Sequence, residues 1–368
     1  PLLRARFQYA GRWVYAVDGM TWLSPSDLEG ADQRSPAKEL LELRWKYWPD
    51  SAAPSAPRAR VSLFGIDYEE RQEVYLLWPE QGEGEPRIVD YASGAVLIYP
   101  DLAERLGAIK SRLLLSALRT RAAALEADCA RIIVPGEDMR ASLERRGTPP
   151  ERLRVIPNWA DLSRIEGGPL DDNPIRRERG WTRDRVLMYA GNLGAAHDLA
   201  TMQNLVAQLA LRVPSLHLVI VGNSPRHRLF ERNARGDGVA RVTRLPFQDR
   251  ARLGDLLGAA DAHLIAQKPE ADGLLVPSKF YGAVAAGRPT IFVGSEAAEV
   301  GSLTRRHRLG AIVRPGATAE GLEKAAATLT LLARRPEEAR RLREWAHEHA
   351  DRKQRTTQFR KVLEEAAA

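Results

Sequence analysis

The segment Val276-Pro-Ser-Lys-Phe-Tyr-Gly-Ala-Val-Ala-Ala-Gly-Arg-Pro-Thr-Ile-Phe292 decides the fold, because it contains a helix start, a helix stop and a strand start. Pro277 and Ser278 predict the start of a helix, since serine caps helices well and proline is tolerated in the first turn. The apolar residues of the next two turns share one helical face. Gly287 predicts the end of the helix, and Pro289 precedes a buried strand. The segment therefore predicts a loop, a short helix, a tight turn and a strand.

Strands and helices alternate on both sides of this segment. Short apolar runs are separated by amphipathic stretches, which is typical of βαβ units and predicts an α/β fold with a parallel sheet covered by helices on both faces. A helical pattern rich in Ala, Leu, Arg and Glu then occupies 318–367. The predicted strands are 186–190, 216–221, 239–244, 262–266, 290–293 and 310–313, and the predicted helices are 198–211, 225–234, 250–258, 278–286 and 297–305.

A second glycine-containing turn supports a binding site in this part of the chain. The sequence Ala190-Gly-Asn-Leu-Gly-Ala-Ala-His-Asp198 follows an apolar strand and precedes an apolar helical pattern. Such a turn presents backbone N–H groups to phosphate, and Lys279 adds a positive charge at the start of the other helix. Both turns follow parallel strands, whose carboxyl ends are the usual position for ligands. Together they predict a site for an anionic ligand such as a diphosphate.

Four motifs resemble those of the family 4 retaining glycosyltransferases of the GT-B fold, and they occur in the same order. They are Arg154-Val-Ile-Pro-Asn-Trp-Ala-Asp161, Tyr189-Ala-Gly-Asn-Leu-Gly-Ala-Ala-His-Asp198, Val221-Gly-Asn223 and Pro277-Ser-Lys-Phe-Tyr-Gly-Ala-Val-Ala-Ala-Gly-Arg-Pro289. The resemblance implies two Rossmann-like domains with a cleft between them, and a C-terminal helix that crosses back to the first domain. The implied parts are an N-terminal acceptor-side domain at 1–165, atypical before about 95, a nucleotide-sugar-binding domain at 166–335, and crossing helices at 336–368.

The resemblance also implies which residues hold the donor and take part in catalysis. Lys279, Asp101 and Asp272 are the expected catalytic residues: Lys279 holds the diphosphate, Asp272 or Glu270 contacts the donor sugar, and Asp101 belongs to an acceptor-domain segment similar to one of the family. Phe247 is expected either to stack on the nucleotide base or to pack under its loop. The implied donor-binding residues are Gly191, Asn192, Gly194, His197, Arg226, Phe247, Pro277, Ser278, Lys279 and Glu299.

Several positions depart from the family pattern. Asn192 and His197 stand where relatives often carry an arginine and a lysine, so more of the positive charge falls to Lys279, or to Arg226 and Arg228. His197 is expected either to contact the diphosphate or to make a local hydrogen bond at the helix start. The family's pair of glutamates is absent, because those two positions are occupied by leucine and glycine here. The region before about 95 also lacks the glycine-rich turn that the family's first domain usually shows, and its possible strands are 13–17, 60–64 and 73–78. The polar stretch around 162–184 predicts a linker between the domains.

The composition narrows the range of functions. Lys and Arg number 55 against 48 Asp and Glu, which gives a net charge of +7. This charge suits a nucleotide, an anionic membrane surface, nucleic acid or simply a solvated surface. Cys129, the single cysteine, excludes an internal disulfide and fits a reducing compartment. No apolar run approaches 18 residues, so no membrane span is predicted. The stretch 44–48, Arg-Trp-Lys-Tyr-Trp, fits a membrane interface, stacking on nucleic-acid bases or a half-buried amphipathic helix.

These features predict a cytoplasmic retaining glycosyltransferase, with peripheral contact at the inner face of the membrane. It would move a sugar from a nucleoside diphosphate, expected to be UDP, to a glycan or lipid-linked acceptor in cell-surface polysaccharide assembly. No cofactor and no metal are expected, and nucleic acid is not an expected partner. The alternatives are a GT-B relative with epimerase chemistry and a catalytically silent GT-B protein that acts as a binding or scaffold partner.

Overall fold

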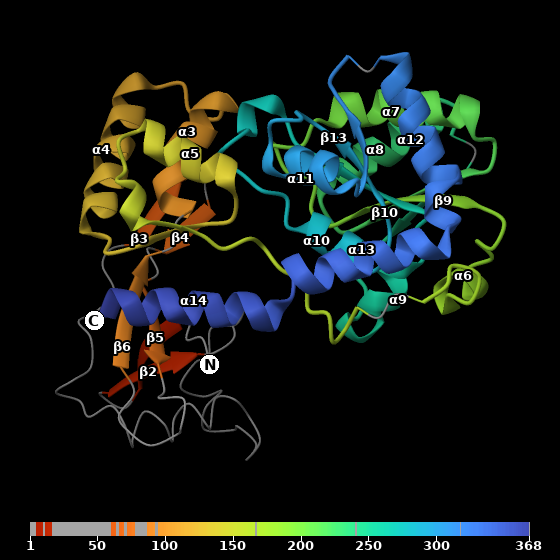
Figure 1. The fold of residues 1–368 in the computed structure, drawn as a ribbon. Coiled ribbons are helices and arrows are strands. Elements are labelled where there is room, and N and C mark those ends of the chain that lie inside the picture. The colour runs from red at the N-terminus through yellow and green to blue at the C-terminus, as the bar shows by residue number, and fades with distance from the viewer. Residues whose placement is uncertain are drawn as a thin grey trace. The chain divides into compact units, whose positions relative to one another are not determined.

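The computed structural model describes residues 95–165, 168–239, 241–316 and 318–367, together with the backbone of six strands between residues 5 and 92 (Figure 1). The aromatic and basic stretch at 44–48 lies outside these residues. The chain separates into two compact units. The first contains Pro1–Leu97, Ala127–Arg131 and Phe359–Ala368, and the second contains Ile98–Glu126 and Ile132–Gln358.

The first unit contains three antiparallel hairpins. Each hairpin joins two neighbouring strands of the chain, and three of the six strands were expected from their β-branched and aromatic residues. The strands are β1 (Ala5–Tyr9) with β2 (Arg12–Ala16), β3 (Arg60–Leu63) with β4 (Ile66–Glu69), and β5 (Gln72–Leu77) with β6 (Arg87–Ala92). The last helix, α14 (Arg352–Ala367), divides between the two units after Gln358.

The second unit begins with three helices and a small parallel sheet. α3 (Ala95–Arg105) and α4 (Arg112–Asp128) pack through Ala103, Ile109 and Leu115. β7 (Ile132–Val134) pairs in parallel with β8 (Leu153–Val155), and α5 (Glu137–Arg145) connects them. Pro100 lies inside α3, where the sequence analysis had recognised only a motif and no helix.

A six-stranded parallel sheet forms the centre of the second unit, as the alternation of strands and helices predicted. Its order is β11-β10-β9-β12-β13-β14, and every neighbouring pair is parallel. The chain builds outward from β9 to one edge and then returns to β12 to build the other. The strands are β9 (Arg185–Ala190), β10 (Leu216–Val221), β11 (Arg241–Leu245), β12 (Ala262–Ala266), β13 (Thr290–Val293) and β14 (Gly310–Val313).

Both faces of this sheet are buried, which explains why its strands are continuous apolar runs. Leu187 and Tyr189 point into one core cluster and Val186 and Met188 into another, because successive side chains of a strand alternate between faces. The first cluster contains residues of α7 (Leu199–Arg212), α8 (Pro225–Gly236) and α12 (Ala319–Thr330). The second contains α6 (Pro174–Glu178) and α9 (Leu253–Gly258), so part of the stretch predicted as a linker, including buried Trp181, belongs to the core.

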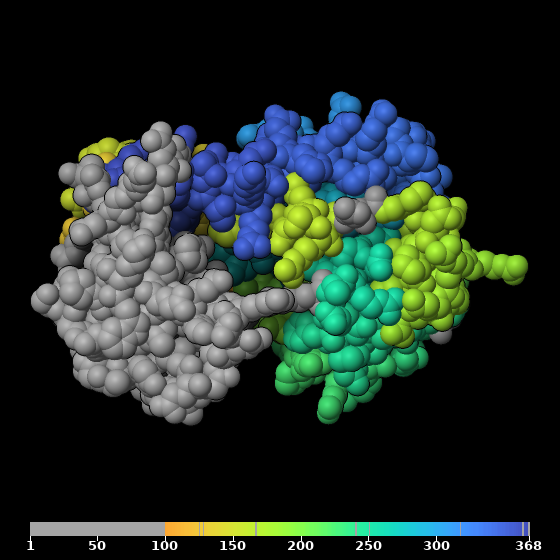
Figure 2. Space-filling model, turned by 90° about the horizontal axis from the view of Figure 1, so that it is seen from below, coloured from red at the N-terminus to blue at the C-terminus, as the bar shows by residue number. Residues whose placement is uncertain are grey.

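The C-terminal helices attach to the sheet through aromatic contacts. Trp345 of α13 (Pro336–His349) lies 5.9 Å from the Phe280 ring and stacks on Tyr281, both in α10 (Lys279–Ala285). Figure 2 shows blue residues from the C-terminal part of the chain at the surface. α11 (Glu299–His307) packs against β13 and β14. No helix within the described parts of the chain is both long and apolar enough to cross a bilayer.

The start of α7 offers a test of helix capping next to the second glycine turn. The Asp198 side chain accepts a hydrogen bond from the Thr201 N–H at 3.0 Å. Removing such a cap typically destabilises a protein by about 1 kcal/mol. We expect Asp198→Ala to lower the free energy of unfolding by about that amount in urea titrations. Asp198→Asn keeps an acceptor oxygen and should unfold close to the wild type; equal losses in both variants would show that the cap is not the cause.

Candidate functional site

The candidate site lies at the point where the strand order of the parallel sheet reverses. β9 and β12 are neighbours, but the chain leaves them toward opposite edges of the sheet, so the loops after their carboxyl ends diverge and leave room for a ligand. The turn after β9 starts at Gly191, whose φ of 113° is a conformation that side chains other than glycine rarely adopt. The loop after β12 is held to this turn, because the Lys268 N–H donates to the Ala196 carbonyl at 2.8 Å.

Lys279 is the centre of the contacts at this turn. Its Nζ donates to the Tyr189 hydroxyl at 2.6 Å and lies 3.3 Å from the Asn192 carbonyl oxygen and 3.2 Å from Nε2 of His197. The same Nζ is 4.1 Å from the centroid of the Tyr189 ring. Burial without a paired carboxylate lowers the pKa of Lys279 to about 7. The lysine is therefore poised to gain a proton and a full charge when an anion arrives.

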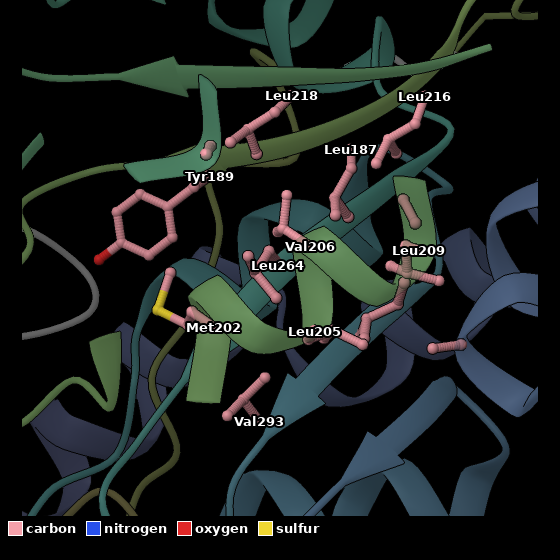
Figure 3. Close-up of a cluster of buried hydrophobic side chains, with 14 of the residues drawn as sticks. Leu187, Tyr189, Met202, Leu205, Val206, Leu209, Leu216, Leu218, Leu264 and Val293 are labelled. Carbon is pink, nitrogen blue, oxygen red and sulfur yellow. The ribbon is translucent and has the colours of Figure 1, made fainter. Parts of the chain in front are cut away.

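The ring of Tyr189 packs against the Lys279 ammonium. Figure 3 shows its ring beside Met202, with the hydroxyl directed away from the leucine side chains of the core cluster. The hydroxyl donates to the Asn192 carbonyl at 2.7 Å while it accepts from Lys279. Burial raises the pKa of Tyr189, so the phenol stays protonated. Tyr189 begins one of the four motifs, but the sequence did not predict it as a site residue.

His197 links the lysine to the backbone of the turn, as the prediction of a local hydrogen bond anticipated. Its Nδ1 is 3.0 Å from the Gly194 nitrogen and 3.2 Å from the Gly194 carbonyl oxygen, so its tautomer decides which of the two it meets. Burial and the nearby Lys279 lower the pKa of His197 to about 4, so the ring is neutral at pH 7. When Nε2 accepts from charged Lys279, Nδ1 carries the hydrogen and donates to the Gly194 carbonyl. The Gly194 N–H is then open to a ligand.

Two residues at the start of α8 also contact the carbonyl oxygens of the glycine turn. Arg226 donates a hydrogen bond to the Gly194 carbonyl, and Nε2 of His227 lies 3.0 Å from the Gly191 carbonyl oxygen. The His227 ring packs edge-on against Tyr189, at 5.9 Å between centroids. A Cβ on Gly222 would lie 2.5 Å from the His227 ring, so the glycine is required for this packing. Sequence reasoning missed His227; its position directly after a glycine turn and a serine-proline helix start was the available signal.

The prediction that Ser278 caps the helix after it is wrong. α10 starts at Lys279, but Ser278 itself has helical backbone angles and its side chain makes no capping hydrogen bond. A capping residue needs a non-helical conformation to bring its oxygen over the N2 and N3 amides. The Ser278 side chain is exposed instead, while Pro277 is buried. Phe247, at 55% exposure after β11, does not pack under its loop.

Glu299 is engaged in a reciprocal contact between two helix starts. Its carboxylate accepts from the Glu137 N–H of α5 at 2.9 Å, and the carboxylate of Asp138 accepts from the Glu299 N–H of α11 at 2.9 Å. Burial raises the pKa of both Asp138 and Glu299. The structure therefore gives Glu299 a capping contact, which the prediction of a donor contact did not foresee.

The three residues predicted to be catalytic have different surroundings. Lys279 lies at the glycine turn. Asp272 lies in the loop after β12, where Gln267 donates to it at 3.1 Å and burial raises its pKa. Both oxygens of Asp101 are ion-paired, with Arg119 at 2.9 Å and Arg146 at 3.1 Å, which ties α3 to α4 and α5.

The charge pattern of the turn suits an anion. Within the described residues, the hydrogen bonds of the Lys279 and Arg226 side chains are all with neutral oxygen or nitrogen atoms. Two cations beside a glycine turn at the end of a parallel strand, with a backbone N–H that can become free, form a set of donors for phosphate oxygens. No three His, Cys, Asp or Glu side chains of the described ranges lie together as they would around a metal ion.

The fold of the chain is similar to that of GT-B glycosyltransferase structures. Anabaena HepE in complex with UDP-glucose superimposes with a TM-score of 0.57 and 17% identity, over 68% of each chain. WaaG, a glycosyltransferase involved in lipopolysaccharide biosynthesis, gives a TM-score of 0.52 and 21% identity, over 72% of this chain and 71% of WaaG. At these identities the likeness establishes the fold, and confirms the predicted fold class.

Sequence comparison finds relatives for about half of the chain. "Probable glycosyltransferase WbjE" of Pseudomonas aeruginosa is 28% identical over 184 residues, which are 49% of this chain and 44% of WbjE. The chain spans less than half the length of the curated relatives it matches. No family model matches the sequence.

Proposed function

We propose that this chain is a retaining glycosyltransferase that moves a sugar from a nucleoside diphosphate, with UDP as the expected nucleotide, to an acceptor in cell-surface polysaccharide assembly. Two kinds of comparison support the proposal. The sequence relative WbjE is named a glycosyltransferase, and the structural neighbour HepE binds UDP-glucose. The acceptor in this proposal is a glycan or a lipid-linked sugar, met by a cytoplasmic protein at the inner face of the membrane.

One observation in the structure carries the proposal: Lys279 and Arg226 converge on the glycine turn after β9, and neither is paired with a carboxylate of the residues that the structure describes. Burial disfavours the charged form of Lys279, and a diphosphate bound beside it would restore that charge. The Gly194 N–H and the Lys279 ammonium would hold its oxygens, with Arg226 alongside. His197 would fix the lysine by accepting from its Nζ.

The reaction needs stabilisation of the leaving group more than it needs a strong base. As the bond between C1 of the sugar and the phosphate oxygen breaks, negative charge develops on the diphosphate, and preformed donors stabilise that charge. The acceptor oxygen then bonds to C1 on the same face, and its proton passes to the departing phosphate oxygen. A separate catalytic base is not required in this scheme, so the ion-paired Asp101 has no assigned step.

Lys279 and Arg226 supply the positive charge in this proposal, and no metal or cofactor is assigned a step. Asp272 is the acid in the loop beside the turn, and a contact with a hydroxyl of the donor sugar is its proposed role. Phe247 offers an exposed ring beyond the end of β11 for the base. These two roles stay predictions that follow from position alone.

The proposal is tested by thermal unfolding with UDP, GDP, TDP and ADP, followed by sugar release from the matching nucleotide sugar. A ligand present at a hundred times its Kd stabilises the folded state by about 2.7 kcal/mol. We expect one nucleotide, UDP, to raise the melting temperature and the others to do so much less. We also expect Lys279→Ala to lose both the shift and the sugar release.

The same measurements separate the proposed enzyme from a catalytically silent GT-B protein. A nucleotide-dependent shift without any sugar release or transfer would favour the silent protein. If no nucleotide alters the melting temperature, the diphosphate assignment of the turn is wrong.

A further inference from the structure

The start of α4 presents an apolar surface that the core does not use. Leu113 is 85% exposed and Leu114 42% exposed, and Ala117, one turn later, is also exposed. Leu115, which lies between Leu114 and Ala117 in the sequence, is buried and packs with Ala103 and Ile109. A surface helix normally turns its polar side outward, so leucines on the outer face of the first turn need another explanation.

These leucines differ from the other exposed apolar residues of the chain. Among the described residues, the remaining exposed large apolar side chains are Leu211, Leu229, Phe247 and Leu331, and no two of them are neighbours in sequence. Isolated exposed leucines are normal at protein surfaces. Leu113 and Leu114 instead form a pair with Ala117 on one helix, which we call the α4 leucine surface.

The charges around the α4 leucine surface select an anionic partner. Residues 105–125 contain five basic side chains and no acidic one. Arg119 is paired with Asp101 and Glu104, whereas Lys110 and Arg112, which are exposed, flank the leucines directly. Leucines that enter the acyl boundary while lysine and arginine meet anionic headgroups are the pattern of an interfacial helix. α4 forms the outer edge of its group of helices (Figure 1).

We propose that the α4 leucine surface docks onto an anionic phospholipid bilayer, with Leu113 and Leu114 inserted at the headgroup boundary and Lys110 and Arg112 on the headgroups. This inference rests on the membrane contact in the proposed function and names the surface that makes it, but it does not depend on sugar transfer. Docking at α4 would hold the second unit at the membrane without a spanning segment. An acidic protein or a second copy of the chain would compete with a bilayer for the same surface.

The test is co-sedimentation of the full chain with vesicles of phosphatidylcholine, alone or with an equal part of phosphatidylglycerol. We expect binding to the anionic vesicles, which weakens at high salt. The double variant Leu113→Ser/Leu114→Ser should bind at least about tenfold more weakly, since each removed leucine loses its burial in the acyl boundary. Lys110→Gln/Arg112→Gln should weaken binding at low salt and leave less dependence on salt.

The matched control is Leu211→Ser/Leu331→Ser, which removes two exposed leucines from α7 and the end of α12 and should bind like the wild type. Thermal unfolding of each variant shows that it is folded, and the nucleotide shift reports on the donor site separately. Three outcomes would overturn the proposal: no binding by the wild type, equal binding by the α4 leucine variant, or equal loss in the control. Dissociation of an oligomer by Leu113→Ser/Leu114→Ser without lipid would assign the surface to a second copy instead.

Discussion

Lys279→Met is expected to make the ligand-free protein more stable while it removes the response to the nucleotide donor. In the folded protein burial lowers the pKa of Lys279 to about 7, from an ordinary value of 10.5 in the unfolded chain. At neutral pH, folding therefore buries a charge that is more stable in water, and this lowers the free energy of unfolding. Methionine has a similar length and no charge, and it can pack over the Tyr189 ring, from whose centroid Nζ lies 4.1 Å.

The effect of Lys279→Met should depend on pH in a defined window. Between pH 7 and 10.5 the unfolded lysine binds a proton that the folded one does not, so the free energy of unfolding of the wild type rises with pH. Below pH 7 both states are protonated and the full cost of the buried charge is present. The variant should therefore gain most at pH 7 and below, and the gain should vanish toward pH 10.5. We expect a gain on the order of 2 kcal/mol, reduced by the partial solvation of the ammonium.

Donor binding should change in the opposite direction. A diphosphate stabilises the charged lysine, so its binding takes up a proton and its affinity should fall as the pH rises above 7. Loss of the charge in Lys279→Met should weaken UDP binding by about 3 kcal/mol, which is more than a hundredfold. Calorimetric titration at several pH values and in buffers of different ionisation enthalpy measures both the affinity and the proton uptake.

The control for this prediction is Lys324→Met, which removes an exposed lysine paired with Glu320 on α12. It should leave the response to nucleotides unchanged. Lower stability of Lys279→Met at every pH, or an unchanged response to UDP, would contradict the assignment of Lys279 as a strained diphosphate ligand.

The sheet could be predicted from the sequence because each of its strands is marked by residues that are adjacent in the chain. Each strand of the second unit is a short apolar run between turns, and buried residues such as Val186 and Leu187 fill both faces, so the run itself marks the strand. Boundaries of the six predicted strands lie within two residues of those in the structure. The N-terminal hairpins β1–β2, β3–β4 and β5–β6 were predicted only in part, since their alternation is interrupted by charged residues.

The sequence predicted the glycine turn and the lysine of the site, but not the contacts between their side chains and the rest of the protein. The glycine turn after β9 and Lys279 are motifs that a sequence shows directly. The hydrogen bond between Lys279 and Tyr189 joins residues 90 positions apart, and the reciprocal caps of Asp138 and Glu299 join α5 to α11. Such pairings depend on how elements pack in three dimensions, which periodicity along the chain does not report.

Arg176→Met is expected to cause a large loss of stability, because Arg176 is a buried charge whose two terminal guanidinium nitrogens make four hydrogen bonds. The side chain is fully buried in α6, a helix of only five residues within the stretch predicted as a linker. Its guanidinium donates to the Asp261 carboxylate at 2.8 Å and to the carbonyl oxygens of Ala259, Trp181 and Asp184 at 2.8–2.9 Å. It thereby holds α6 against the first residues of β9 and β12.

Methionine fills much of the same space but leaves three buried carbonyl groups and a buried carboxylate without their donor. Breaking a buried ion pair from one side typically costs about 3–5 kcal/mol, and we expect Arg176→Met to lose that much in urea unfolding. Asp261 would keep the Arg334 Nε at 3.2 Å and the Val186 N–H at 2.8 Å, so the carboxylate is not left entirely unpaired. The double variant Arg176→Met/Asp261→Asn should recover part of the loss, since it also removes the uncompensated charge.

The matched control is Arg252→Met, which removes an arginine that donates to both oxygens of exposed Glu178 at 2.7 and 2.8 Å. Water and salt screen this pair, so its removal should leave the urea midpoint almost unchanged. Each arginine pairs with one carboxylate at nearly the same distance, so the contrast compares a buried guanidinium that also donates to three carbonyl oxygens with an exposed one. If Arg176→Met unfolds at the same urea concentration as Arg252→Met, the buried pair does not anchor α6 to the sheet, and the binding turn at the far end of β9 would not depend on it.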